Sequence, residues 1–382
     1  MPFHFDAAEY SARQARATRA LRAEGLDALI MFAPESHYWI CGYDTFGFAM
    51  FQAMVLTARG DLHLLTRKPD RLQALHTSTL DADHVHVWPQ YEGSDPALHL
   101  RNLVADLGLA SGRLGFESET AGLTDANGQR LRAAFPGLED RSDLVPALRR
   151  VKSPAEIAMH RHAARLADDA MDAGLAETRA GAFEGDILAA MQGAVLRGGG
   201  DYAGNEFIIG SGPAALLCRY QSGRRHLDAR DQMTWEWAGV HARYHAAMMR
   251  TVIIGHPNDR QRHMHAAATA ALEACEAAIR PGAPMGNVFD AHAEVFDAFG
   301  LKEARMQACG YGMGAAYTPI WVDFPMFYEG NPLLMQAGQV FFLHMILMDE
   351  TEGLAMCPGH SVLVTDQGAE RLSRQPLDLL VR

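Results

Sequence analysis

Apolar and polar residues alternate along residues 233–238, a pattern typical of a half-buried β-strand. Glu236 and its even-numbered neighbours fall on one face, while Trp235 and Trp237 fall on the other. The pattern predicts a strand, a short turn at Gly239 and a second strand. Glu236 is then a single carboxylate between two large aromatic residues. It is either solvated at an edge or held in a polar pocket, where apolar neighbours would raise its pKa.

Helix-like and strand-like patterns alternate in the first part of the chain. An amphipathic pattern over residues 7–25 predicts a helix that ends at a glycine, and the apolar run 26–32 predicts a buried strand. Residues 53–57 and 62–66 predict two strands joined by a turn. Residues 34–48 are rich in aromatic residues and glycine, and we expect a loop there. These elements together predict an α/β domain with a mixed sheet.

A helix start marks a domain boundary just after residue 150. Ser153 is placed as an N-cap, Pro154 at the first helical position, and Glu156 completes a capping box. We therefore expect two domains, residues 1–150 and 151–382. In the second domain the patterns predict helices at 154–178, 184–198, 258–279 and 285–299, strands at 206–212, 339–348 and 361–365, and a glycine-rich connection at 307–314.

Composition restricts the class of protein. The chain has 382 residues, of which 48% are hydrophobic, so it can bury a sizeable core. Its formal net charge of −12 argues against a nucleic-acid partner, which requires a basic face. The five cysteines include no C-x-x-C pair, and no signal peptide or membrane-length apolar run is present. We expect a cytoplasmic protein with no membrane partner.

Ordered landmarks along nearly the whole chain resemble the creatinase / aminopeptidase P / prolidase family. They are residues 148–153 with Glu156, Ile209-Gly-Ser-Gly212, Arg250-Thr251 at the end of the predicted hairpin, Gly310-Tyr-Gly-Met-Gly314, residues 334–340 and residues 362–368. The resemblance implies an α+β fold, in which a pita-bread C-terminal domain follows a smaller α/β creatinase-type N-terminal domain. It also implies a homodimer.

The chain departs from this family at the metal-ligand positions. The family's peptidases bind two metal ions through Asp, Asp, His, Glu and Glu, and these positions fall here on Glu236, Ala247, Tyr311, His344 and Gly359. Alanine and glycine have no ligating side chain, and two divalent ions need several anionic oxygens. The resemblance therefore implies a site that uses neither a metal ion nor another cofactor.

Some members of the family are metal-free and hydrolyse C–N bonds in small solutes, as creatinase and ectoine hydrolases do. The segments 234–239, Tyr244-His245 and Gly310-Tyr311 look more similar to ectoine-hydrolase-like members than to creatinase. The resemblance implies a metal-independent hydrolase of an amidine or amide C–N bond in a small polar solute. Two alternatives stay open: an Xaa-Pro peptidase-type metallohydrolase, and a non-catalytic pita-bread binding protein.

Four residues are candidates for the chemistry. Glu236 would attack the carbon as a nucleophile or serve as the base for water. His344 and His245 would protonate the leaving nitrogen, since histidine titrates near neutral pH; either is otherwise a structural histidine. Tyr311 would donate to developing charge or to a ligand carboxylate, and is otherwise a core tyrosine with a bonded hydroxyl.

The remaining candidates would bind the substrate. Arg219 offers a fork to a carboxylate, and is otherwise solvated or paired with an acid. His360 lies beside the last ligand position and ranks lower. Aromatic residues would form an apolar wall against an amidinium group or, alternatively, fill a core; they are Tyr38, Trp39, Tyr43, Phe46 and Trp321. Cys218 and Cys309 carry no family motif, and we expect both to be inert.

Overall fold

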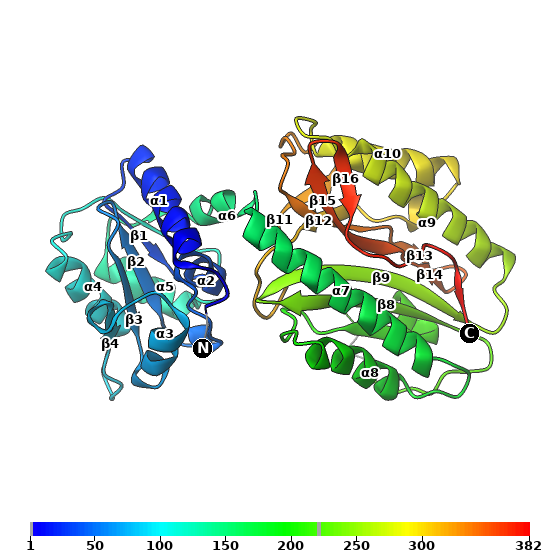
Figure 1. Ribbon diagram of the computed structural model, residues 1–382, viewed down its shortest axis with the longest axis horizontal. Coiled ribbons are helices and arrows are strands. Elements are labelled where there is room, and N and C mark those ends of the chain that lie inside the picture. Colours follow the sequence, from blue (N-terminus) through cyan, green and yellow to red (C-terminus); the bar gives the residue numbers. More distant parts are fainter. Residues whose placement is uncertain (1–2, 220–222) are drawn as a thin grey trace. The chain divides into compact units, whose positions relative to one another are not determined.

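The computed structural model describes residues 3–219 and 223–382, and it divides into two compact units, Met1–Arg149 and Arg150–Arg382 (Figure 1). This division lies one residue before the boundary predicted from the capping box. Each unit is described by itself below. No helix in the described part of the chain is both long enough and apolar enough to cross a membrane.

The first unit is built on a mixed six-stranded sheet with the strand order β4-β3-β2-β1-β5-β6. Its strands are β1 (Ala28–Met31), β2 (Ala53–Thr57), β3 (Leu62–Thr66), β4 (Val85–Val87), β5 (Leu114–Phe116) and β6 (Glu139–Asp140). Its helices are α1 (Ala7–Ala23), α2 (Pro34–Cys41), α3 (Arg71–Thr77), α4 (Pro96–Asp106), α5 (Asp125–Ala134) and α6 (Leu144–Arg149). Apolar cores lie on both faces of the sheet.

The loop predicted over residues 34–48 is wrong at its start, because Pro34–Cys41 forms helix α2. Glu117 holds the start of this helix in place, because its carboxylate accepts hydrogen bonds from the backbone of Phe32 and Ala33, just before the helix, and from the Ser36 hydroxyl. A carboxylate near a helix N-terminus also interacts favourably with the helix dipole. Glu117 lies more than 80 positions away in the chain, so the local sequence does not reveal this contact.

The second unit contains a nine-stranded sheet with the main strand order β11-β10-β12-β15-β9-β8-β7, extended by β16 and β17. Its strands are β7 (Ile208–Ser211), β8 (Asp231–His241), β9 (Tyr244–Ile254), β10 (Ala308–Gly312), β11 (Asp323–Tyr328), β12 (Val340–His344), β13 (Leu347–Asp349), β14 (Leu354–Met356), β15 (Gly359–Thr365), β16 (Gly368–Arg371) and β17 (Leu380–Val381). Its helices are α7 (Pro154–Glu177), α8 (Glu184–Arg197), α9 (Asp259–Ala278) and α10 (Gly286–Ala298). The glycine-rich segment 307–314, predicted as a connection, is mostly strand β10.

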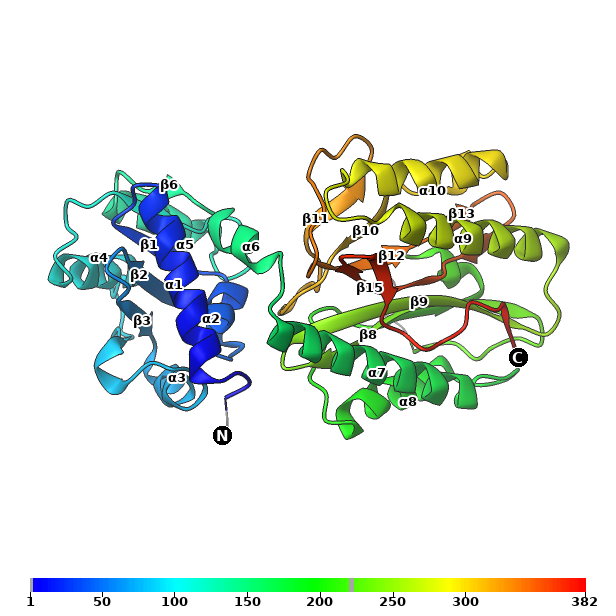
Figure 2. The same cartoon turned by 45° about the horizontal axis from the view of Figure 1, so that its top comes forward.

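The four helices lie against the sheet in two pairs (Figure 2). One apolar core joins α7 and α8 to β7, β8 and β9. A second core joins α9 and α10 to β10, β12 and β15. Trp237 on β8 points toward the first pair, because its indole N–H donates to the backbone oxygen of Ala167 on α7 at 2.8 Å. The odd-numbered face of β8 is therefore the helix-covered face.

The β8–β9 hairpin turns at Ala242 and Arg243, which have φ values of 49° and 65°, and not at Gly239 as predicted. Gly239 lies within β8, where its missing side chain has a packing role. A Cβ at this position would lie 1.9 Å from the backbone oxygen of Ala163 on α7. The glycine therefore allows a close helix–strand approach, which the sequence pattern does not distinguish from a turn.

Candidate functional site

One row of paired residues crosses four strands of the second unit. Glu236 on β8 pairs with Met249 on β9, Met249 pairs with Gly359 on β15, and Gly359 pairs with His344 on β12. Directly opposed residues in antiparallel strands point to the same face of a sheet. Glu236 and His344 therefore share the face opposite to the helices, although 108 positions separate them in the chain.

Tyr311 connects the two ends of this row. On β10 it pairs with Phe342, which lies two residues from His344 and so on the same face. The centroid of its ring lies 5.6 Å from that of His344. Its hydroxyl accepts a hydrogen bond of 2.9 Å from the indole N–H of Trp321, and burial together with the nearby charge of Glu236 raises its pKa. Four candidates named from the sequence thus come together: Glu236, Tyr311, His344 and Trp321.

The carboxyl group of Glu236 is suited to proton transfer near neutral pH. Its side chain is 8% exposed, and burial raises its pKa to about 7. The positive charge of Arg219 and the nearby hydroxyl of Tyr311 oppose this rise. An ordinary glutamate is fully ionised at pH 7, whereas this one is about half ionised, as expected for a general base matched to its working pH.

Arg219 lies near the same group of residues from a solvent-exposed position. Its charge opposes the burial that raises the pKa of Glu236 and of Tyr311, and it adds to the burial that lowers the pKa of His344. One guanidinium nitrogen donates to the backbone oxygen of Cys218 at 2.8 Å. A cation that is exposed yet close to a buried carboxyl is well placed to meet a charged ligand as it enters. The three residues that follow Arg219 lie outside the described part of the chain.

His344 is neutral at physiological pH. Burial and, to a smaller extent, the charge of Arg219 lower its pKa to about 4. A group with this pKa is not an imidazolium at pH 7, so it offers a neutral N–H or a lone pair to a ligand. His344 stays a candidate to interact with the leaving nitrogen of the substrate. It would do so as a neutral hydrogen-bond partner and not as a charged acid.

His245 lies on the same face of the sheet as Glu236, but its ring is bonded to the backbone. It lies at the start of β9, and its Nε2 accepts a hydrogen bond of 2.8 Å from the backbone N–H of Gly204. Burial lowers the pKa of its imidazole to about 4, so Nε2 carries no proton at pH 7. Its ring contacts Trp321, with centroids 6.1 Å apart. We therefore reassign His245 from proton donor to structural acceptor.

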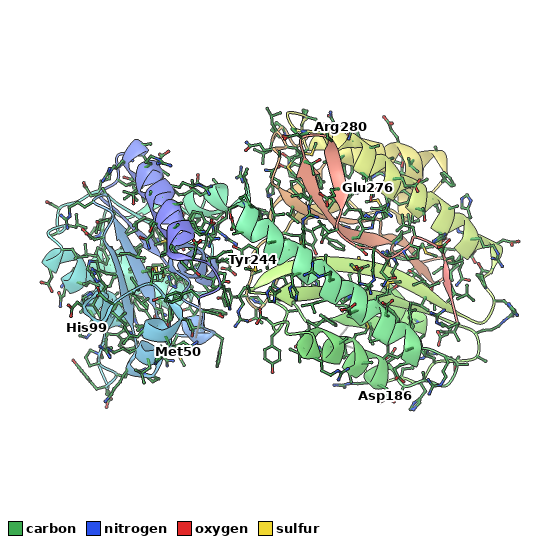
Figure 3. The ribbon with its side chains drawn as sticks, viewed as in Figure 1. Met50, His99, Asp186, Tyr244, Glu276 and Arg280 are labelled. Carbon is green, nitrogen blue, oxygen red and sulfur yellow. The ribbon has the colours of Figure 1, made fainter. Side chains whose placement is uncertain are left out.

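His360 points to the wrong face. It follows Gly359 directly on β15 and pairs with Met248, so it lies on the helix-covered side of the sheet. There its Nε2 is hydrogen-bonded to Glu276 of α9, which is labelled in Figure 3 and also binds Arg371 at 3.1 and 3.2 Å. Because the side chain is fully buried in this cluster, the prediction that His360 binds substrate is wrong.

The aromatic residues of the first unit divide into two groups. Tyr38, Trp39 and Tyr43 are at most 1% exposed, and Trp39 and Tyr43 belong to an apolar core of that unit, as the core alternative predicted. Tyr38 is hydrogen-bonded to His4, and Trp39 lies under the guanidinium of Arg13. Trp39 and Tyr43 are therefore core residues of the first unit, and the role of Tyr38 in a wall for a ligand stays a prediction. Phe46 is 85% exposed and remains available for contact.

Cys357 is a site neighbour that the sequence reasoning missed. It precedes Gly359 by two positions, and its backbone N–H donates to the Thr251 hydroxyl at 3.0 Å. Burial raises the pKa of its thiol to about 12, and the charge of Glu236 adds to the rise. It is a neutral thiol and not a nucleophile. The sequence did contain a signal, because Cys357 lies two residues before Gly359, the last of the five family metal-ligand positions.

A curved sheet with helices on one face and a buried polar group on the other defines a pita-bread hydrolase fold. Residues 158–366 match the metallopeptidase family M24, and residues 13–151 match the creatinase/prolidase N-terminal domain. The M24 match covers more than half of the chain, so the protein belongs to this family of hydrolases, and the resemblance to the creatinase/prolidase family is confirmed.

Curated relatives align along the whole chain. An uncharacterized hydrolase/peptidase of Sinorhizobium fredii is 28% identical, with 99% of each chain covered. The ectoine hydrolase of Halomonas elongata is 25% identical, with 99% of this chain and 98% of its own covered. Among solved structures, the dipeptidase PepE of Mycobacterium ulcerans superposes with a TM-score of 0.86 at 24% identity and 99% coverage of both chains. That last likeness shows the fold alone.

The family is named for metallopeptidases, which implies bound metal ions, but the residues at the five family metal-ligand positions supply few donor atoms. Of the five positions carried over from the peptidases, only Glu236 supplies an anionic oxygen, and Ala247 and Gly359 supply no donor. A Cβ at 359 would already lie 2.6 Å from the backbone oxygen of Leu343. Within residues 3–219 and 223–382, no three His, Cys, Asp or Glu side chains are arranged to hold a metal ion. The donor set does not fit a two-ion centre.

Proposed function

We propose that this protein is a metal-independent hydrolase that opens an amidine or amide C–N bond in a small polar solute. The observation that carries the proposal is Glu236, a buried carboxyl with a pKa of about 7 on the face of the sheet opposite to the helices. The full-length similarity to an ectoine hydrolase supports the choice of substrate class.

The chemistry needs one group that accepts a proton and returns it. In one route, ionised Glu236 takes a proton from water while the water oxygen bonds to the amidine carbon. The protonated carboxyl then gives that proton to the leaving nitrogen, and the C–N bond breaks. In the other route, the carboxylate itself attacks the carbon, and the leaving nitrogen takes a proton from water as the C–N bond breaks. The hydroxide so formed hydrolyses the acyl-enzyme (from an amide) or imidoyl-enzyme (from an amidine) and frees the carboxylate. Both routes begin from the ionised form of Glu236.

The surrounding residues support a substrate that carries both a negative carboxylate and a positive amidinium group. Arg219 can pair with a carboxylate through its planar fork. An amidinium group near Glu236 would replace the solvation that the carboxyl loses on burial. Neutral His344, which is 5.6 Å from Tyr311 between ring centroids, can hydrogen-bond the leaving nitrogen.

The test is turnover by the purified protein with ectoine, with creatine and with an Xaa-Pro dipeptide, each before and after chelation and dialysis. We expect hydrolysis of an amidine-type solute, unchanged by chelation and lost in Glu236→Gln. Cleavage of the dipeptide that depends on a stoichiometric metal ion would establish the peptidase alternative. Tight binding of a solute without hydrolysis would establish the binding-protein alternative.

We also propose that the protein is cytoplasmic and acts as a homodimer. All five cysteines are unpaired thiols, which fits a reducing compartment. The family resemblance supports the dimer. Light scattering coupled to size-exclusion chromatography at micromolar concentration would measure the mass, and a monomer mass near 41.8 kDa would refute the dimer.

A further inference from the structure

Three histidine side chains gather at one edge of the sheet in the first unit. His63 lies on β3, His86 lies on the edge strand β4, and His84 ends the short helical turn that leads into β4. In the parallel β3–β4 ladder Leu65 pairs with His86, and His63 lies two residues before Leu65, on the same face of the strand. The ring centroid of His63 lies 4.7 Å from that of His84 and 5.4 Å from that of His86. The ladder therefore brings three imidazole rings together.

Two of the ring nitrogens are as close to each other as two ligands of one metal ion. The Nδ1 of His63 lies 3.2 Å from the Nε2 of His86. Two nitrogens bound tetrahedrally to zinc at about 2.0–2.1 Å lie about 3.3 Å from each other. One ion between the two rings would therefore leave the spacing of these nitrogens almost unchanged. Without an ion, the same contact is a hydrogen bond from one imidazole to the other.

Both rings are neutral at pH 7, as metal binding requires. Burial and the neighbouring histidines lower the pKa of His63 to about 4, and burial and the charge of His84 lower the pKa of His86. A neutral imidazole offers a lone pair to a metal ion without first losing its charge-bearing proton.

Carboxylates surround these histidines and favour a cation among them. Asp81 binds the Nδ1 of His84 at 2.6 Å. The negative charges of Asp61 and Asp81 also act on His63. The charge of Asp106, at the end of α4, acts on the histidine of β4. A divalent ion held by neutral imidazoles keeps both of its positive charges, and nearby carboxylates offset them without binding the ion.

We propose that His63 and His86 bind one divalent transition-metal ion of the zinc type, with water as the remaining ligands. Imidazole is a ligand that zinc, copper and nickel accept readily, whereas magnesium and calcium prefer oxygen. Within residues 3–219 and 223–382, no group of three His, Cys, Asp or Glu side chains is arranged to hold an ion, so His84 contacts the ring of His63 and is not a ligand. The site belongs to the first unit, and Glu236 belongs to the second, so the proposal does not rest on the proposed function.

A bound ion would join the edge strand to the rest of the sheet. The ladder between β3 and β4 contains three residue pairs, and β4 has no partner on its other side in the strand order. A short edge strand is a place where a sheet opens easily. An ion that binds the folded ladder more tightly than the unfolded chain should therefore stabilise the first unit as its concentration rises.

The first test measures binding without any substrate. Full-length protein is stripped of metal by chelation and dialysis and then titrated with zinc chloride at pH 7.5, by calorimetry and by thermal melting. We expect one saturable site per chain and a melting temperature that rises with zinc. His63→Gln and His86→Gln should each weaken binding by at least about tenfold and remove the rise. Magnesium chloride at the same concentration should have no effect.

Two control variants separate this site from other histidines. His99→Gln removes a histidine of the same unit that contacts the Ser94 hydroxyl at 3.4 Å (His99 is labelled in Figure 3). His241→Gln removes one ring of a second histidine pair, which stacks on His162 with centroids 3.9 Å apart in the second unit. Both variants should bind zinc with the affinity of the wild type.

The second test identifies the ligand atoms. In protein labelled with ¹⁵N in its histidine rings, zinc should shift the Nδ1 signal of His63 and the Nε2 signal of His86, because these two nitrogens face each other. The ring signals of His99 should stay at their positions. This measurement uses the wild-type chain, so it remains decisive if a substituted chain does not fold.

Two results would overturn the proposal. One is the absence of saturable zinc binding in the micromolar range, which would leave only a hydrogen bond between two imidazoles. The other is zinc binding that keeps the wild-type affinity in His86→Gln, or that shifts ring signals of other histidines instead. Absence of turnover with every solute would count against the proposed function alone, because neither test needs a substrate.

Discussion

Replacing Glu236 by glutamine should make the protein less sensitive to pH and more stable in alkaline solution. The folded-state pKa of Glu236 is about 7, compared with 4.5 for an ordinary glutamate. Because the folded pKa is raised, the folded state binds this proton more tightly than the unfolded chain does. The stabilisation is fully present below about pH 4.5 and is lost as the pH rises through 7.

The magnitude follows from the difference between these two pKa values. One unit corresponds to about 1.4 kcal/mol, so the wild-type protein should lose about 3 kcal/mol relative to Glu236→Gln between pH 4.5 and 8.5. The side chain is 8% exposed, so solvent screening reduces this figure little. Other buried acids, such as Glu117, are common to both proteins and cancel in the comparison.

Urea unfolding at pH 5, 7 and 8.5, followed by tryptophan fluorescence, measures the difference directly. We expect the free energy of unfolding of Glu236→Gln to exceed that of the wild type increasingly as the pH rises. Glu329→Gln, at an exposed position, serves as the control and should stay parallel to the wild type. If the two curves for wild type and Glu236→Gln ran parallel from pH 5 to 8.5, the carboxyl would not be desolvated and the argument for a general base would fail.

Three further predictions concern other positions. Gly239→Ala should cost more than about 3 kcal/mol, because its Cβ would lie 1.9 Å from the backbone oxygen of Ala163; soluble yield and thermal melting measure the loss. His360→Ala should lower stability by about 2–4 kcal/mol by removing the partner of Glu276, while kcat/KM of the folded fraction stays at the wild-type value; a fall in kcat/KM without a fall in stability would return His360 to the site. Cys357, with a thiol pKa of about 12, should resist iodoacetamide at pH 8 in the native protein and react after unfolding, as mass spectrometry would show; rapid alkylation of native Cys357 would contradict its burial.

Local patterns were sufficient where neighbouring residues decide the structure. The capping box of Ser153 and Glu156 starts helix α7 as predicted, because both partners lie within one turn. Alternation along β8 placed Glu236 and Trp237 on opposite faces, because side chains of a strand alternate whatever it packs against. The carboxylate at the centre of the site was therefore identifiable from the sequence.

Tertiary structure decided which other residues reach that carboxylate. His344 joins Glu236 only through strand pairings that run across β9 and β15, and no local pattern contains that register. His360 is adjacent to Gly359 in sequence but lies on the opposite face, and His245 is bonded to a loop backbone. The sequence by itself determined the residue types and the faces of single strands, because these depend on neighbours. Only the folded sheet determined the site, because its members meet across strands that are distant in the chain.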